Sequence, residues 1–347
     1  MLPTARSVSI AARGLASASI MPVHSLAIDI LRILERHGPL DPAALASACG
    51  CRPAELRPVT RRLLAERRLS LDDNGFAIEG FDFLDADRIR ASLLGSARAL
   101  AVGVLDACAS TNTVLLDGAS LESPRLLLAE EQTAGRGRRG RRWISGVGDA
   151  LTLSLRRRVA RPLRDLPALS LVSGVAASRA LRALGASAVG LKWPNDLVVA
   201  EAGGSAKAKL GGILVETRQQ GARITTVIGI GINVRESRRV HASLPRRVAS
   251  LEQLLAPLPS RNALAAALAN ELCAALDAFE RAGFGAAQRE WEALHAYAGE
   301  RMRVRLANGR VLDGTADGLD ERGALRLRTR TGMHAVHSGR VVTARAA

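Results

Sequence analysis

A segment rich in glycine and arginine has the clearest potential for chemistry in this sequence. Residues 129–143 read AEEQTAGRGRRGRRW. Arginine guanidinium groups offer rigid forks of donors that suit phosphate and carboxylate groups, and glycine lets a backbone approach a ligand closely. We therefore predict a loop that closes over a polyphosphate. Its arginines and the glycines between them are Arg136, Gly137, Arg138, Arg139, Gly140, Arg141 and Arg142.

The same segment also matches the dinucleotide-binding pattern G-x-G-x-x-G, at Gly135, Gly137 and Gly140. That pattern requires a helix directly after the glycines and an acidic residue about twenty positions further on. Here WISGVGDALTLSLRR follows, which predicts a turn and a strand, and arginines occupy the region near position 157. The context therefore argues against a Rossmann fold. No G-x-x-x-x-G-K-[ST] stretch is present, which excludes a P-loop nucleotidase.

A second group of polar residues lies in the neighbouring stretches LKWPNDLVVA and KLGGILVE. Pro-Asn-Asp after an extended segment predicts a turn between two strands. Either stretch alone is typical of a structural turn with a solvated lysine. Together they place two lysines, Lys192 and Lys209, with Asn195 and Asp196 at one end of a sheet, beside glycines that leave space.

Two further segments suit an uncharged ligand. Ser110, Thr111 and Asn112 lie between the strand-like AVGVLDA and a helical stretch. A helix needs one such residue as its N-cap, so the others leave polar groups available for a ligand. In VIGIGINV, glycines on a buried strand would admit a flat ring, with Asn233 at its rim.

The first element that must position these groups is a helical module over residues 24–80. HSLAIDILRILERHG has one apolar helical face and ends at Gly38. Asp41 is the expected N-cap of a short helix with Pro42 in its first position, a third helix follows, and Asp-Asn-Gly predicts a hairpin. This order is typical of a winged helix-turn-helix DNA-binding domain. The same arrangement can also serve as a docking module.

The third helix of this module would be the one that contacts DNA. Pro58 falls in its second turn if the helix starts near Ala54, where it removes a hydrogen bond or bends the helix. Other side chains of the helix could still meet phosphates or base edges. These DNA-binding candidates are Arg57, Thr60, Arg61 and Arg62.

The pattern of predicted helices and strands changes twice in the rest of the chain. From about residue 98 to 297, short β-like runs alternate with helical segments at 166–184 and 261–280, which predicts a mixed α/β domain. After Tyr297, short alternating strands separated by Gly and Asn predict a small β-barrel.

Composition sets broader bounds. The chain has 347 residues, 48% apolar and 24% charged, as expected of a soluble globular protein with several domains. A net charge of +16 favours polyanionic or acidic partners, although a general abundance of arginine explains it equally well. Nine aromatic residues are too few for a base-stacking platform.

The cysteines and the N-terminal residues bear on the compartment of the protein. The four cysteines, which include no C-x-x-C pair, are interpreted as free thiols in a reducing compartment. No apolar run reaches the roughly 18 residues of a membrane span. The first twenty residues resemble a transit peptide in composition, but a start at Met21 explains them equally. We expect a disordered tail on a cytoplasmic protein.

In their order along the chain, these motifs resemble those of biotin protein ligases. A lipoate ligase is not expected to carry the arginine-glycine loop. The two flanking domains look like those of the bifunctional bacterial type, which is also the biotin operon repressor. The resemblance covers about residues 24–347. The motifs are Ser110-Thr111-Asn112, the stretch from Gln132 to Trp143, KWPND at 192–196, KLGGILVE at 209–216 and GIGIN at 229–233.

The resemblance implies an α+β fold in which a mixed α/β biotin/lipoate ligase-like domain lies between two small domains. The expected units are a tail over 1–23, the winged helix-turn-helix over 24–84, the catalytic domain over 85–297 and an SH3-like barrel over 298–347.

It also implies roles for individual residues. Ser110, Thr111, Asn112 and Gln132 would bind the ureido ring of biotin, which needs donors and acceptors. Arg136, Gly137 and Arg138 would close over the biotin carboxylate and the phosphates of ATP. Arg138 and Lys209 would be catalytic, with Lys209 neutralising charge on the carboxylate and on the developing acyl phosphate. Asp196 would orient or deprotonate the acceptor lysine. The nucleotide-binding candidates are Arg139, Arg141, Trp143, Lys192, Asn195 and Asn233.

The implied reaction adenylates biotin with ATP and Mg²⁺, and then transfers biotin from biotinyl-5′-AMP to a lysine of the biotin carboxyl carrier protein of acetyl-CoA carboxylase. No metal-binding residues of the protein itself are expected. A homodimer and operator DNA are the other implied partners, and no membrane is involved. Two departures from the family pattern stand out. EAGGSAKA lengthens the segment before Lys209 and makes Lys207 a rival, and Arg345 is only loosely matched as a nucleotide contact.

Two alternatives remain open at this point. A purely regulatory protein would sense the ligand without catalysis, and loss of Lys209 or of the arginine loop would mark it. A ligase that has lost DNA binding would keep the winged helix only to order its active site. A salt-dependent shift of operator DNA would separate a DNA-binding ligase from this second type.

Overall fold

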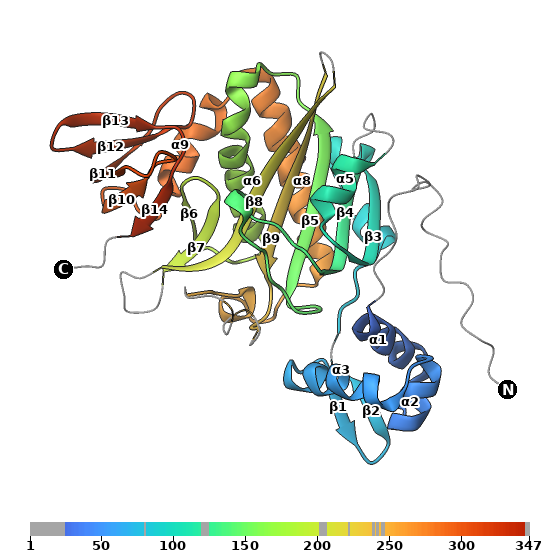
Figure 1. The fold of residues 1–347 in the computed structure, drawn as a ribbon. Helices are drawn as coiled ribbons and strands as arrows, with labels where there is room; N and C mark the ends of the chain where they lie inside the picture. The colour runs from blue at the N-terminus through green and yellow to red at the C-terminus, as the bar shows by residue number, and fades with distance from the viewer. Residues whose placement is uncertain are drawn as a thin grey trace.

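The computed structural model describes residues 25–79, 81–118, 125–200, 207–220, 223–237, 240, 243 and 247–343. The expected tail over 1–23, most of the EAGGSAKA segment and Arg345 lie outside these residues. Along the chain, a small helical module is followed by a large sheet with helices packed on it, and then by a small β-domain (Figure 1). This is a mixed α+β fold, as the sequence predicts.

The N-terminal module has three helices and a hairpin. The Asp41 carboxylate accepts hydrogen bonds from the N–H groups of Ala43 and Ala44, which confirms it as an N-cap. The third helix continues as one helix through Pro58. The elements are α1 (Leu26–His37), α2 (Pro42–Ala48), α3 (Pro53–Ala65), β1 (Leu69–Asp72) and β2 (Gly75–Ile78).

The central sheet has seven strands in the order β3-β4-β5-β9-β8-β7-β6. Only the β3–β4 pair is parallel. Each expected β-like run corresponds to one of these strands. The strands are β3 (Ala101–Cys108), β4 (Arg125–Gln132), β5 (Ala150–Arg158), β6 (Val189–Lys192), β7 (Asp196–Ala200), β8 (Lys207–Gln220) and β9 (Arg223–Asn233).

Helices cover the two faces of this sheet unequally. Successive residues of a strand face opposite sides, so Leu126 and Leu128 of β4 lie in the main core with α6 (Leu169–Ala183) and α8 (Arg261–Ala282). Leu127 instead belongs to a small cluster with α5 (Thr111–Asp117). The face of the sheet that carries α5 therefore has room for a binding site. The other helices among the described residues are α4 (Ala86–Ala91) and α9 (Gly285–Ala293), with 3-10 turns at Gly95–Ala99, Arg138–Gly140, Leu163–Ala168 and Leu251–Gln253.

The C-terminal domain is a five-stranded antiparallel sheet in the order β13-β12-β11-β10-β14. Its apolar residues, such as Met302 and Leu325, continue the main core. The Trp193 indole N–H also donates to the carbonyl of Gly323, at 3.1 Å. The strands are β10 (Arg301–Arg305), β11 (Val311–Leu319), β12 (Leu325–Thr329), β13 (Gly332–Val336) and β14 (Arg340–Thr343).

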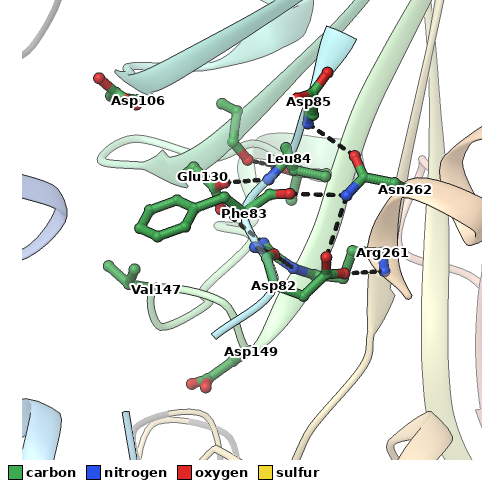
Figure 2. A network of polar contacts seen from close by, with 12 residues as sticks. Asp82, Phe83, Leu84, Asp85, Asp106, Glu130, Val147, Asp149, Arg261 and Asn262 are labelled. Atoms are coloured by element: carbon green, nitrogen blue, oxygen red, sulfur yellow. Dashed lines mark hydrogen bonds and ion pairs between the residues drawn. The ribbon is translucent and has the colours of Figure 1, made fainter. Parts of the chain in front are cut away.

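The segment that leaves the N-terminal module is fastened to the large domain by a polar network (Figure 2). The Leu84 N–H donates to Glu130 Oε1 at 2.6 Å, and Asn262 Nδ2 donates to the carbonyl of Phe83 at 2.8 Å. Arg261 pairs with Glu130 at 2.7 Å, with both side chains buried. Because the buried charges of Glu130 and Arg261 are paired with each other, their burial at this connection is tolerated.

A second contact joins the same two parts of the chain. Arg68, which precedes β1, pairs with Asp149, and their side chains are 4% and 2% exposed. Its Nε also donates to the carbonyl of Val147 at 3.1 Å. The Val147 side chain belongs to the apolar core of the N-terminal module. The segment between the arginine-glycine loop and β5 is therefore built into that module.

Within the described parts of the chain, no helix has both the length and the apolar character needed to span a bilayer.

Candidate active site

Three strands of the central sheet form the floor of a cavity on the side covered by α5. Side chains alternate along β9, so Ile228, Ile230 and Ile232 fill the core while Gly229 and Gly231 between them face the cavity. The open space, including the part that is continuous with solvent at its mouth, is about 590 Å³. The floor consists of two rows of opposed residues, Ser154–Gly229–Leu214 and Thr152–Gly231–Gly212.

The glycines of β9 are required by the side chains that lie against them. A Cβ on Gly229 would stand 2.4 Å from Asn112 Oδ1, and one on Gly231 would stand 2.6 Å from Trp143 Cε2. A separation under 3 Å is not sterically allowed. The flat ring expected over this strand is therefore, at Gly231, the protein's own indole.

A chain of hydrogen bonds fixes the expected biotin-binding residues. Thr111 donates its N–H to Gln132 Oε1 at 2.8 Å, and its hydroxyl lies 2.7 Å from Ser154 Oγ. Ser154 Oγ donates in turn to Asn112 Oδ1 at 2.5 Å. Ser110 is the N-cap of α5, but its side chain makes no cap hydrogen bond. These four predicted residues, Ser110, Thr111, Asn112 and Gln132, all line the cavity.

The arginine-glycine segment forms a tight hairpin between β4 and β5. The Trp143 N–H donates to the carbonyl of Gly135 at 2.8 Å, and the Gly137 N–H donates to the carbonyl of Arg141 at 2.7 Å. Arg139 takes the left-handed conformation, with φ 59°. Its guanidinium also lies 3.2 Å from Ser338 Oγ, so the loop touches the C-terminal domain.

Several guanidinium groups of this hairpin face the cavity. Burial, and then the charges of Arg139 and Arg141, lower the pKa of Arg138. A site that already disfavours its own positive charge gains from binding an anion. The predicted residues of the hairpin that line the cavity are Arg136, Gly137, Arg138, Arg141, Arg142 and Trp143, whereas Arg139 and Gly140 are not among the lining residues.

Lys209 faces the same cavity because of an irregularity in β8. Leu197 pairs with Gly211, and Val198 pairs with Lys209, so Leu210 is an extra residue on β8. This β-bulge re-aims the side chain that precedes it. The Lys209 ammonium reaches Asp196 and passes over Gly212, where a Cβ would stand 2.9 Å from its Nζ. The structure therefore brings Lys209 and Asp196 together as an ion pair at the cavity.

Lys207, the rival of Lys209, lies elsewhere. Its ammonium pairs with Glu300 at 2.5 Å and lies 4.3 Å from the centre of the Tyr297 ring. The ammonium of Lys192 also lies near Tyr297, 5.3 Å from the centre of the same ring. Neither lysine is among the residues that line the cavity.

Two asparagines that are predicted to bind nucleotide donate hydrogen bonds to backbone carbonyls of the protein itself. Asn195 lines the cavity, but its Nδ2 donates to the carbonyl of Ile213 at 2.8 Å. Asn233 donates to the carbonyl of Ala249 at 3.0 Å and to that of Lys209 at 3.3 Å. It lines a second cavity, which also includes Ser237. Asn233 thus links this second cavity to the backbone of Lys209.

Sequence patterns missed two residues of the site, Ser154 and Glu216. Glu216 Oε2 accepts from Asn112 Nδ2 at 2.9 Å and from Arg136 Nη2 at 2.8 Å. The available signal was an acidic residue in the otherwise apolar GGILVE strand. Its partners could not be foreseen, because they lie on α5 and on the hairpin.

The expected DNA-binding residues do not form one exposed group. Arg57 and Arg61 are exposed on α3, and Arg62 is half-buried. Thr60 is only 4% exposed, and its hydroxyl donates back to the carbonyl of Leu56 at 3.2 Å. Positions 57 and 61 are one turn apart and share a face of the helix, whereas position 60 points to one side of that face. Thr60 therefore belongs to the inner face of the helix.

Cysteine thiols and clusters of metal ligands are two further kinds of group that could carry chemistry. Burial raises the pKa of Cys108 to about 12, so its thiol stays protonated at neutral pH. Among the residues that the structure describes, no three His, Cys, Asp or Glu side chains gather as a metal site would require.

Two family models match the chain. Residues 104–233 match the biotin/lipoate A/B protein ligase family, and residues 297–343 match the biotin protein ligase C-terminal domain. The first match contains the cavity floor, the hairpin and Lys209, and the second coincides with the C-terminal β-domain.

Individual proteins agree with these matches. The bifunctional ligase/repressor BirA of Escherichia coli K12 is 38% identical over 251 residues, which cover 72% of this chain and 74% of that protein. The biotin–[acetyl-CoA-carboxylase] ligase of Mycobacterium tuberculosis is 34% identical, over 70% of this chain and 89% of that protein. A biotin protein ligase of Aquifex aeolicus, solved with biotin and ATP, is 25% identical with a TM-score of 0.59. The match covers 71% of this chain and 99% of that one.

Proposed function

The chain belongs to the biotin protein ligase family and is a ligase, and from this premise we propose a two-step reaction for its cavity. It activates biotin with ATP to biotinyl-5′-adenylate and transfers the biotinyl group to a lysine of the biotin carboxyl carrier protein of acetyl-CoA carboxylase. The observation that carries the proposal is the convergence of Lys209 and the arginine-glycine hairpin on the cavity that Thr111, Asn112 and Gln132 also line.

The ureido ring of biotin is assigned to the inner end of the cavity. It is neutral and needs fixed donors and acceptors. Thr111, Asn112 and Gln132 are already oriented by hydrogen bonds, through Ser154 in two cases. Groups that are held in place before a ligand arrives cost little to organise when it binds. Ser110 adds a hydroxyl that is not used for capping.

The charged end of biotin and the phosphates of ATP are assigned to the hairpin and to Lys209. ATP enters as its magnesium complex, in which Mg²⁺ screens the triphosphate. The lowered pKa of Arg138 supports this placement, because a bound anion removes the unfavourable crowding of positive charge. Arg136, Gly137 and Arg138 close over the carboxylate and phosphates. Lys209 stabilises the charge that develops on the acyl phosphate.

The nucleoside is assigned to the second cavity and its border. Asn233 lines that cavity, and the Trp143 indole stands at the neighbouring floor. Arg141, which lines the first cavity, is assigned to the phosphates. The guanidinium of Arg139 contacts Ser338, so Arg139 is assigned to the border of the site. Lys192 and Asn195 keep supporting roles, because each has contacts within the protein.

In the first step, a biotin carboxylate oxygen bonds to the α-phosphorus of ATP and the bond to pyrophosphate breaks. In the second step, the amine of the acceptor lysine bonds to the acyl carbon, and AMP leaves with the bridging oxygen. The amine loses its proton to a base, for which Asp196 is the candidate. No nucleophile of the protein is needed. The protein positions the reactants and keeps water from the anhydride.

The N-terminal module is proposed to be a winged helix-turn-helix that binds operator DNA and makes the protein a biotin-responsive repressor. Its three helices and hairpin support this, as does the name of the BirA relative. Arg57, Arg61 and Arg62 are the contacts we propose. The other proposed finer features are the domain limits at residues 84 and 297, an SH3-like barrel at the C-terminus, a homodimer formed through the central sheet and a cytoplasmic location.

A purely regulatory protein is the competing account. It would lack the groups that stabilise the adenylation step, whereas Lys209 and the hairpin arginines line the cavity here. A ligase without DNA binding is separated from the bifunctional form by measuring a salt-dependent shift of operator DNA in the presence of the adenylate.

The decisive experiment is biotin-dependent ATP–pyrophosphate exchange. We expect exchange in the unmodified protein, a loss of about 10²–10³-fold in Lys209→Ala, as for removal of a donor to a developing anion, and retention in the matched variant Lys207→Ala. Arg138→Gly should release free adenylate. A folded protein without biotin-dependent exchange would leave the regulator as the better account.

A further inference from the structure

One carboxylate joins two separate parts of the candidate site. Glu216 lies on β8 and continues the row of side chains that begins with Gly212 and Leu214 on the cavity floor, since side chains two apart share a face. Its Oε2 accepts hydrogen bonds from both Asn112 and Arg136. Asn112 and Arg136 line the cavity, whereas Glu216 is not among the lining residues. Any effect of Glu216 on a ligand therefore passes through these two residues.

The bond to Asn112 settles which way its amide faces. The Nδ2 group has two hydrogens, and these are directed to Glu216 Oε2 at 2.9 Å and to the carbonyl of Leu214 at 3.2 Å. The Oδ1 atom accepts from Ser154 Oγ at 2.5 Å. With both hydrogens directed to the protein, Asn112 presents an acceptor lone pair to the cavity. A rotation of the amide by 180° would place Oδ1 against the Glu216 carboxylate, which is repulsive.

The bond to Arg136 connects the hairpin to the sheet. Arg136 Nη2 lies 2.8 Å from Glu216 Oε2, and this single contact leaves the other N–H groups of the guanidinium available for an anion. The side chains of Arg136 and Glu216 are 43% and 25% exposed, so water weakens their attraction without removing it. The strand is the fixed partner, because Glu216 lies within the long antiparallel pairing of β8 with β9, opposite Val227.

We propose that Glu216 is a positioning residue for the biotin site, which orients the Asn112 amide as an acceptor and tethers the arginine-glycine hairpin over the cavity through Arg136. The proposal rests on the proposed ligase function. It predicts that Glu216 controls how tightly biotin and its adenylate are held, more than the rate of the chemical step once both substrates are bound. A binding effect that is equal in the ground state and the transition state raises KM and leaves kcat unchanged.

The test compares Glu216→Ala and Glu216→Gln in biotin-dependent ATP–pyrophosphate exchange. Glu216→Ala removes both hydrogen bonds, and we expect the KM for biotin to rise tenfold or more, with kcat within about twofold. The fraction of adenylate released to solvent should rise as well. Glu216→Gln keeps an acceptor oxygen without the charge, so it should recover much of the KM. Asp317→Asn is the matched control, because the Asp317 carboxylate also binds two side chains, Arg326 and Arg328, and is 30% exposed, but lies in the C-terminal domain.

Coupling to Arg136 is tested by combining variants. If Glu216 holds the hairpin through Arg136, adenylate release in Glu216→Ala/Arg136→Ala should match that of Arg136→Ala alone, because both changes remove one contact. Additive effects would overturn the tether. A purely structural role would lower the urea midpoint of Glu216→Ala without separating KM from kcat, and that result would also overturn the inference.

The failure of each proposal is recognisable. If the unmodified protein shows no biotin-dependent exchange, the proposed function fails and this inference with it. If the unmodified protein exchanges and Glu216→Ala keeps the same KM for biotin and the same adenylate release, the ligase stands and only the role of Glu216 is overturned.

Discussion

The indole of Trp143 lies directly on the backbone of Gly231, where a Cβ would stand 2.6 Å from Cε2 and 2.7 Å from Cζ2. Trp143 is also hydrogen-bonded to Gly135 at the start of the arginine-glycine hairpin. One close contact therefore sets the height of the hairpin over the cavity floor. Gly229 has the same relationship to Asn112 two residues earlier, which makes the two glycines a matched pair.

We predict that Gly231→Ala and Gly229→Ala impair different substrates. Forcing extra volume into a packed site costs about 1–3 kcal/mol, or roughly 5- to 150-fold in binding. Gly231→Ala displaces Trp143 and should raise the KM for ATP most, whereas Gly229→Ala displaces Asn112 and should raise the KM for biotin most. Exchange kinetics with each substrate varied in turn will measure this. Equal effects of both variants on both constants would contradict the assignment.

The buried His295 should make stability depend on pH. Burial, and then the charge of Lys207, lower the pKa of His295 to about 4. Among the described residues, neither ring nitrogen has a hydrogen-bond partner, and the ring packs 4.7 Å from that of Trp291. Its pKa in the unfolded chain is about 6.5. Between these values the unfolded state binds a proton that the folded state does not, so stability falls as pH falls, by about 3 kcal/mol in total.

His295→Leu removes this titration, and its urea unfolding free energy should fall less than that of the unmodified protein between about pH 7 and pH 4.5. The exposed His37, at the end of α1, supplies the control. His37→Gln should keep the pH dependence of the unmodified protein. The same loss of stability in His295→Leu as in the unmodified protein would exclude His295 as the cause.

The pair between Arg68 and Asp149 should contribute strongly to stability. Removing one partner of a buried pair leaves an uncompensated charge and costs about 3–5 kcal/mol. We expect Arg68→Ala and Asp149→Ala each to lower the urea midpoint sharply, and the double variant to cost less than their sum. Arg301→Ala, in the exposed pair with Asp313, should leave the midpoint unchanged. Fully additive single variants would show that the pair is not coupled.

DNA binding, if present, should depend on the exposed arginines of α3 and not on its buried threonine. Arg57→Gln and Arg61→Gln should each weaken operator binding and reduce the slope of log K against log salt by about 1, as for one phosphate contact. Thr60→Ala should keep the slope, because its hydroxyl donates to its own helix. Mobility shifts at several salt concentrations, with biotin and ATP present, will measure this. A reduced slope in Thr60→Ala would contradict the placement of Thr60.

Much of the fold could be predicted because its strands and long helices carry strong local signals. The apolar runs of the central sheet and Asp41 before Pro42 are examples in which the residues that decide the element lie within it. Short amphipathic elements such as α4 and α9 were missed, since a helix of a few turns depends on its tertiary contacts more than on its own sequence.

The candidate site was predictable where motifs carry it and unpredictable where pairing across elements decides it. Lys209 could be named from KLGGILVE, but its ion pair with Asp196 depends on the bulge at Leu210, which no pattern reveals. Glu216 was missed because its partners come from α5 and the hairpin. Thr60 was misplaced although the pattern could have shown it, because Leu56 and Leu63, four residues before it and three after it, mark the inner face of α3.

Val147 lies in the apolar core of the N-terminal module although it belongs to the segment that leads from the hairpin into β5. Deleting residues 25–79 would remove the apolar side chains that pack around Val147, and it would leave Asp149 without its ion-pair partner Arg68. A shortened chain would therefore expose the apolar side chain of Val147 and the uncompensated carboxylate of Asp149 close to the hairpin. Loss of this module would therefore require replacements at positions 147 and 149. Engineers who trim the chain to a minimal enzyme face the same requirement, and polar replacements at these two positions should accompany the cut.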